Sequence, residues 1–105
     1  MGYYTCHKII VDGKADEAII EELRHSCKQA EFALKPDGTC AQESKWYDSD
    51  EHLKAFSLKH PEKVFCLHGE GEEPADVWNT YYKNGKMQHC PAIITFESYD
   101  ENKLK

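Results

Sequence analysis

Cysteine and histidine stand close together at four points of the chain, and their side chains are the ones that most directly suggest chemistry. The pairs are Cys6 with His7, His25 with Cys27, Cys66 with His68, and His89 with Cys90. Zinc prefers such nitrogen and sulfur ligands. The chain has no C-x₂-C pair, and adjacent residues of a strand point to opposite faces, so Cys66 and His68 are the pair that would share a face in a regular strand. We predict no metal site, because cysteine is more often a small buried apolar residue, and a zinc-stabilised domain using Cys66 and His68 is an alternative.

The sequence offers little support for catalysis. A cysteine nucleophile needs a lowered thiol pKa and a nearby base, but His89 and Cys90 are adjacent and would point apart in a strand. No glycine-rich loop ends in Lys-Ser or Lys-Thr, and the loop at residues 69–73 has the wrong charge to hold phosphate. We therefore expect no enzyme activity, no catalytic residue and no cofactor.

A dense group of carboxylates follows the apolar run 64–67. It comprises Glu70, Glu72, Glu73 and Asp76. Glycines at 69 and 71 and a proline at 74 predict a loop over residues 69–75. The loop could be a solvated turn that keeps an exposed sheet edge from pairing. A hard-cation site is a second interpretation, but the loop lacks the alternating ligands of an EF-hand.

The third interpretation is an acidic recognition surface with aromatic anchors. In a regular strand, Trp78 and Tyr82 would face the core while Tyr81 would face solvent. Glutamates that meet Arg or Lys on a partner, beside an aromatic anchor, are typical of a protein interface. The predicted partner-binding residues are Glu70, Glu72, Glu73, Asp76, Trp78 and Tyr81.

The elements that must position these residues follow from periodicity and turn signals. Strands are predicted at 3–11, 39–46, 64–67, 77–82 and 87–96, and helices at 16–34 and 49–60. The strand at 39–46 is predicted because the topology needs one after a long helix. Asn84-Gly85 predicts a tight hairpin turn, and Asp16 is the predicted N-cap of the first helix. Phe65, Leu67, Ile94 and Phe96 are expected in the core. The order predicts an α+β domain with two helices packed on one face of a mainly antiparallel sheet, a ferredoxin-like variant (β-α-β-α-β-β-β).

Length and composition bound the class of protein. The 105 residues fit a single domain over positions 1–105. The formal net charge of -6 opposes non-specific attraction to nucleic acid and favours basic partners. No run approaches the ~18 to 20 apolar residues that span a bilayer. The odd number of five cysteines and the absence of a signal-peptide pattern predict reduced thiols in a cytosol.

Residues 45–104 contain KWY before the second expected helix, GEGEE followed by DVW, and the turn YYKNGK. In this order and spacing they resemble a family of small uncharacterised proteins from bacteriophages, prophages and conjugative elements, described as ferredoxin-like domains. The resemblance implies a ferredoxin-like fold and a mobile-element origin, and it transfers no catalytic residue.

These observations together predict a small acidic accessory protein of a phage or mobile element, in the cytoplasm of a bacterial host. It would bind a basic surface of a host protein. Inhibition of a defence or nucleic-acid-handling system, such as a CRISPR effector, is a concrete form, because carboxylates can occupy an Arg/Lys surface that normally grips phosphate. A module that stacks single-stranded nucleic acid is another alternative, which the acidity disfavours. A homodimer is a further alternative, since a chain of this size leaves apolar area exposed.

Overall fold

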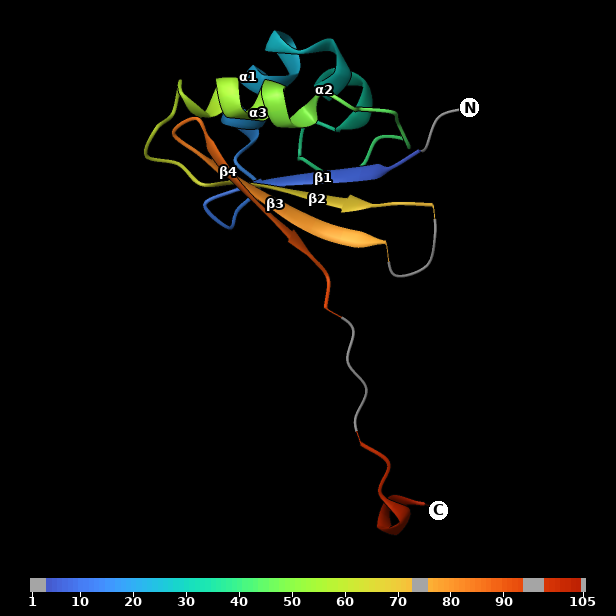
Figure 1. The fold of residues 1–105 in the computed structure, drawn as a ribbon. Helices are drawn as coiled ribbons and strands as arrows, with labels where there is room; N and C mark the ends of the chain where they lie inside the picture. The colour runs from blue at the N-terminus through green and yellow to red at the C-terminus, as the bar shows by residue number, and fades with distance from the viewer. Residues whose placement is uncertain (1–3, 73–75, 94–97, 105) are drawn as a thin grey trace.

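The computed structural model describes residues 4–72, 76–93 and 98–104, and its framework is a four-stranded antiparallel sheet. The strands are β1 (Cys6–Val11), β2 (Phe65–Glu70), β3 (Val77–Lys83) and β4 (Lys86–Pro91), and they lie in the order β1-β2-β3-β4 (Figure 1). The turn between β3 and β4 has positive φ angles of 49° at Asn84 and 78° at Gly85. This is the backbone that a two-residue hairpin requires, so the predicted turn is confirmed.

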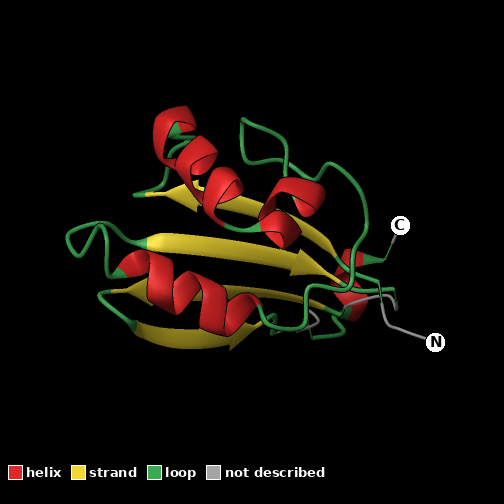
Figure 2. Cartoon of the chain, turned by 90° about the horizontal axis from the view of Figure 1, so that it is seen from above, coloured by secondary structure: helices red, strands yellow, loops and turns green. Residues whose placement is uncertain are grey.

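Three helices cover one face of the sheet and leave the other face open (Figures 1 and 2). They are α1 (Glu17–Ser26), α2 (Lys28–Ala33) and α3 (Ser49–Ser57), and a 3-10 helix η1 (Glu101–Lys103) follows the sheet. As predicted, Asp16 caps α1, accepting a hydrogen bond from the backbone N–H of Ile19 at 3.2 Å. The single helix predicted over 16–34 is wrong: Cys27 has extended backbone, with φ −143° and ψ 116°, and divides it into α1 and α2.

The core lies between the helices and the covered face of the sheet. Its largest members are Ile9, Ile20, Leu23, Leu34, Trp46, Leu53, Phe56, Phe65, Leu67 and Tyr82. Phe65 and Leu67 are thus confirmed as core residues. The predicted core positions Ile94 and Phe96 lie outside the described residues. Tyr82 is buried and Tyr81 is 38% exposed, as the alternation along β3 predicts.

The strand predicted at 39–46 is wrong. This segment makes two isolated bridges, Leu34 with Cys40 and Thr5 with Ser44, and it runs along the outer edge of β1. The N–H of Ile9 donates to the carbonyl of Gly38 at 2.8 Å, so the segment satisfies the outer edge of β1 without joining the sheet. The chain is an α+β protein with helices on one face of an antiparallel sheet, as predicted. These layers are compatible with a ferredoxin-like variant, whose exact strand order is not confirmed.

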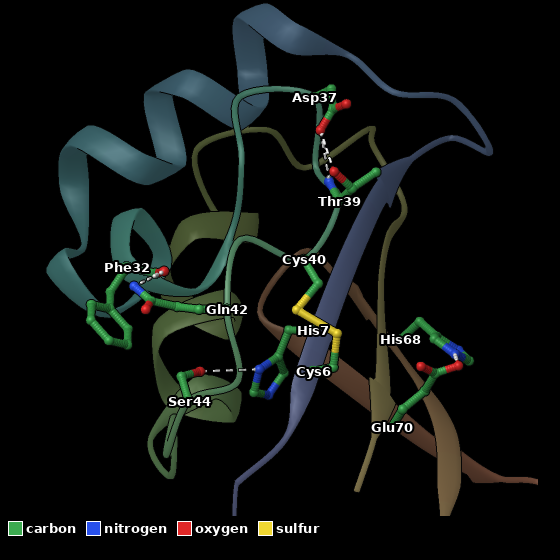
Figure 3. Close-up of a disulfide and its surroundings, with 10 residues drawn as sticks. All are labelled: Cys6, His7, Phe32, Asp37, Thr39, Cys40, Gln42, Ser44, His68 and Glu70. Atoms are coloured by element: carbon green, nitrogen blue, oxygen red, sulfur yellow. Dashed lines mark hydrogen bonds and ion pairs between the residues drawn. A yellow bond between two sulfur atoms is a disulfide. The ribbon is translucent and has the colours of Figure 1, made fainter.

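A disulfide joins Cys6, at the start of β1, to Cys40 in the segment beside it (Figure 3). The prediction that all five cysteines are reduced is therefore wrong for this pair, while Cys27, Cys66 and Cys90 are free thiols. The prediction rested on the odd number of cysteines and on the absence of a signal-peptide pattern. Neither shows which cysteines the fold brings together. Of the helices in the described ranges, none has the length and apolar character needed to cross a bilayer.

Candidate functional site

The acidic loop joins β2 to β3 and is fixed at its base. The N–H of Gly71 donates to the carbonyl of Asp76 at 2.7 Å, and the N–H of Tyr4 donates to Oε1 of Glu72 at 3.1 Å. Glu70 and Glu72 are exposed, whereas Asp76 is half-buried. The fourth predicted carboxylate, Glu73, lies outside the described residues. β2 continues to Glu70, so the prediction of a loop from residue 69 is wrong, and the strand end and the loop together present at least two exposed carboxylates at one end of the sheet.

The position of this loop bears on the first interpretation of its charges. β2 and β3 are the inner strands, and the uncovered edge belongs to β4. The N–H of Ala92 donates to the carbonyl of Val77 at 2.9 Å. Because backbone hydrogen bonds alternate along a strand, the backbone N–H and C=O groups of Met87 and His89 and the C=O of Pro91 point toward that edge. Pro91 has no N–H to offer and so limits pairing at the edge itself. The carboxylates of the loop are not the groups that protect a sheet edge.

The two predicted aromatic anchors lie on opposite faces of the sheet. Tyr81 is on the open face opposite Cys66, together with Glu70, whose carboxylate lies 3.4 Å from Nε2 of His68 (Figure 3). Trp78 is half-buried on the helix side, where it lies against Gly69. The predicted set thus does not form one continuous patch: Trp78 belongs to a pocket on the covered face.

This pocket, here called the aromatic pocket, opens between the sheet and the start of α3. Its volume is about 260 Å³, and it is lined by Thr5, His7, Trp46, Tyr47, Ser49, Asp50, Leu67, Trp78, Thr80, Tyr82 and His89. It borders the acidic loop on two sides, because Gly69 precedes Glu70 and contacts Trp78, and because Tyr4, which is bonded to Glu72, precedes Thr5. The loop and the pocket therefore form one end of the molecule, here called the acidic end.

Asp50 and Tyr82 form the main polar contact of the aromatic pocket. The Tyr82 hydroxyl donates to Oδ1 of Asp50 at 2.5 Å. Burial, and then this contact with Asp50, raise the pKa of Tyr82 far above its usual range, so the phenol stays neutral and keeps donating. The carboxylate of Asp50 is exposed, with one oxygen oriented by the phenol. Sequence reasoning did not select Asp50, which lies within the helix predicted at 49–60 and is 32 residues from Tyr82.

Two imidazoles complete the pocket wall. His7 is 4% exposed, and burial lowers its pKa to about 4, so that it is neutral at neutral pH. Its Nδ1 lies 3.4 Å from Oγ of Ser44 (Figure 3), and its ring meets that of Trp46 edge-on at 5.4 Å. Nδ1 of His89 lies 3.0 Å from Oγ1 of Thr80. His7 therefore contributes an uncharged ring to the pocket wall at neutral pH.

A second group with chemical potential was missed from the sequence. Sγ of Cys27 lies 3.3 Å from Nδ1 of His52, although the two residues are 25 positions apart. The same Nδ1 accepts a hydrogen bond from Nε1–H of Trp46 at 2.9 Å. A ring nitrogen has one lone pair, so the indole competes with the thiol for the nitrogen that would serve as base. We therefore interpret His52 as a residue that positions Trp46 and not as a base for Cys27.

The Cys66 and His68 pair shares the open face, as expected. Both ring nitrogens of His68 have protein contacts, Nδ1 with Oδ1 of Asn79 at 2.7 Å and Nε2 with Glu70. Burial raises the pKa of the Cys66 thiol. In the part of the chain that the structure describes, no three His, Cys, Asp or Glu side chains converge as metal ligands would. No specific contact favours the zinc-stabilised alternative.

Comparisons with protein-family models, curated proteins and solved structures found no match for this chain. The resemblance to mobile-element proteins stays a prediction from the residues that carry it.

Proposed function

We propose that this protein acts by binding a basic surface of another protein through its acidic end. The observation that carries the proposal is that two exposed carboxylates, Glu70 on the open face of the sheet and Glu72 bonded to Tyr4, lie at the end of the sheet where the aromatic pocket with Asp50 opens. None of the described residues that line this pocket is a lysine or an arginine. Exposed carboxylates at this end of the sheet, and aromatic rings with Asp50 in the pocket, suit a partner rich in Arg and Lys.

The position of the loop supports a role in binding rather than in protecting a sheet edge from pairing. Because the loop joins the two central strands, its charges are not needed to prevent pairing at a sheet edge. The hydrogen bonds at Gly71 and Glu72 hold its base in place, so less conformational entropy is lost on binding. Fixed carboxylates on an acidic chain also speed the encounter with a basic partner.

The partner that fits is a bacterial host protein whose Arg/Lys surface normally grips phosphate. Carboxylates that occupy such a surface compete with nucleic acid, which would inhibit a nucleic-acid-handling or defence system, a CRISPR effector among them. This form of the proposal draws on the resemblance to phage and conjugative-element proteins, and it places the protein in the host cytoplasm. In that compartment, glutathione and thioredoxin would act on the Cys6–Cys40 bridge as reductants.

The test is affinity capture from a bacterial lysate with three baits. They are the wild-type chain, the charge reversal E70K/E72K, and the matched reversal E31K/E62K. Glu31 in α2 and Glu62 before β2 are exposed, and neither belongs to the acidic loop or lines the aromatic pocket. Each variant reverses two glutamates, so the two variants have the same net charge. The proposal expects partners recovered by wild type and E31K/E62K to be lost with E70K/E72K. Equal loss with both variants would mean that overall charge matters and the acidic end does not.

A further inference from the structure

The aromatic pocket is lined by aromatic rings, and the indole N–H of one of them, Trp46, is already used in a hydrogen bond. Trp46 is 4% exposed, and its N–H already donates to His52, which lies outside the pocket lining. Tyr82 lies across the pocket with its hydroxyl engaged by Asp50. Trp78 and Tyr47 stand at more open positions, half-buried and 68% exposed respectively. Two indoles and two phenols therefore line a cavity of about 260 Å³.

The lining of the aromatic pocket holds one carboxylate and, among the described residues, no Lys or Arg. Asp50 is its one carboxylate, and in the described part of the chain no Lys, Arg or His nitrogen forms an ion pair with it. His7 is neutral at neutral pH because it is buried, so it does not offset this charge. An anion would meet the Asp50 carboxylate with no Lys or Arg among the described lining residues to hold it.

The shape and chemistry match a cation that has an apolar surface. A strongly hydrated metal ion or ammonium would need several oxygen ligands to replace its water shell, and the pocket offers one carboxylate. An ammonium group that carries methyl groups is weakly hydrated, and rings hold it through their negative faces. A liquid water occupies about 30 Å³, so the cavity holds the equivalent of roughly eight waters, which is room for such a head group.

We propose that the aromatic pocket is a binding site for methylated ammonium groups, with Asp50 as counter-ion and Trp46, Trp78, Tyr47 and Tyr82 as the surrounding rings. The group could belong to a free small cation or to a methylated lysine on a protein. The two sources present the same head group to the pocket and differ in what lies outside it. The site does not use the side chains of Glu70 or Glu72, so its failure and the failure of the acidic-loop interface can be told apart.

The chain carries its own reporter, because both of its tryptophans line this pocket. The first experiment titrates tetramethylammonium chloride into the protein and follows tryptophan emission, with sodium chloride at equal ionic strength as reference. We expect a saturable change with tetramethylammonium and none with sodium. An identical response to the two salts would overturn the proposal.

Substitutions localise the effect. Asp50→Asn keeps an oxygen that accepts from Tyr82 but removes the charge, so it should weaken binding at least tenfold; Glu62→Gln removes one exposed carboxylate elsewhere and should change nothing. Trp78→Leu removes one ring and should also weaken binding, with Trp46 left as reporter. Circular dichroism checks that each variant is folded. Wild-type affinity in folded D50N would contradict the assignment.

Competition distinguishes the two sources. A peptide with trimethyl-lysine that binds tighter than choline would assign the site to a protein ligand, and the reverse order would assign it to a free cation. The same peptide with unmodified lysine should bind at least tenfold more weakly than the methylated one. Equal affinity for the two peptides would overturn the preference for methylated ammonium.

Discussion

Gly69 lies directly against the indole of Trp78, so closely that a Cβ at position 69 would stand 2.7 Å from Nε1 and nearer still to Cε2. These residues are cross-strand partners in β2 and β3. Any side chain at 69 would occupy space that the indole fills. Gly69 is thus the reason that Trp78 can lie flat at the mouth of the aromatic pocket, next to the acidic loop.

Gly69→Ala should therefore displace Trp78. We expect red-shifted tryptophan emission and a free energy of unfolding lower by about 1 to 3 kcal/mol, the usual cost of overpacking. Urea titration followed by circular dichroism measures the stability. In a Trp78→Ala background the same glycine substitution should cost almost nothing, because the clash is gone. A full cost in both backgrounds would show that Gly69 is required for another reason.

His7 should make stability depend on pH below neutrality. Its folded pKa of about 4 lies below the ordinary value of 6.5. Between these pH values the unfolded chain binds the proton and the folded chain does not, so the free energy of unfolding falls as the pH drops from about 6.5 to about 4. At about 1.4 kcal/mol per pH unit, the loss is at most about 3.5 kcal/mol, and it levels off below the folded pKa.

Urea titrations across this pH range check the His7 prediction. His7→Gln, which cannot titrate but keeps a polar group near Ser44, is the control. It should be less stable than wild type at neutral pH and should lose less stability on acidification. Parallel pH profiles for the two proteins would contradict the role of His7.

Reduction of the Cys6–Cys40 disulfide should lower stability without unfolding the protein. The bridge spans 34 residues, and the chain-entropy relation gives about 3 to 4 kcal/mol for a loop of that length. Urea titration with and without a phosphine reductant measures the difference. Thiol counting in denaturant should give three thiols in the unreduced protein, from Cys27, Cys66 and Cys90, and five after reduction. Five thiols before reduction would show that the bridge is not formed.

Local rules explain which parts of the fold could be predicted. The turn at Asn84-Gly85, the cap at Asp16 and the opposite faces of Tyr81 and Tyr82 depend on residues within a few positions of each other. The end of α1 at Cys27 was missed because an apolar residue there continued the helical spacing while the backbone turned to extended geometry. Spacing reports which face a residue occupies and does not report where a helix breaks.

The candidate site was predicted only in part for a different reason. The acidic loop is contiguous in sequence and so was visible, but the contact of Asp50 with Tyr82 spans 32 residues and that of Cys27 with His52 spans 25. Such contacts exist only because α3 packs on the sheet and against α1, and no local pattern encodes them. The aromatic pocket consequently had no signal in the chain beyond the presence of Trp78.

The central claim is that the acidic end binds a basic protein surface, and the most direct test is the affinity for a captured partner. The dissociation constant is measured for wild type, E70K/E72K and E31K/E62K at about 50 mM and about 300 mM salt, conditions that change the screening of exposed charges. We predict that E70K/E72K binds at least tenfold more weakly than E31K/E62K at low salt and that wild-type binding weakens at high salt. Equal dissociation constants for the two variants, with no effect of salt on the wild type, would contradict the account.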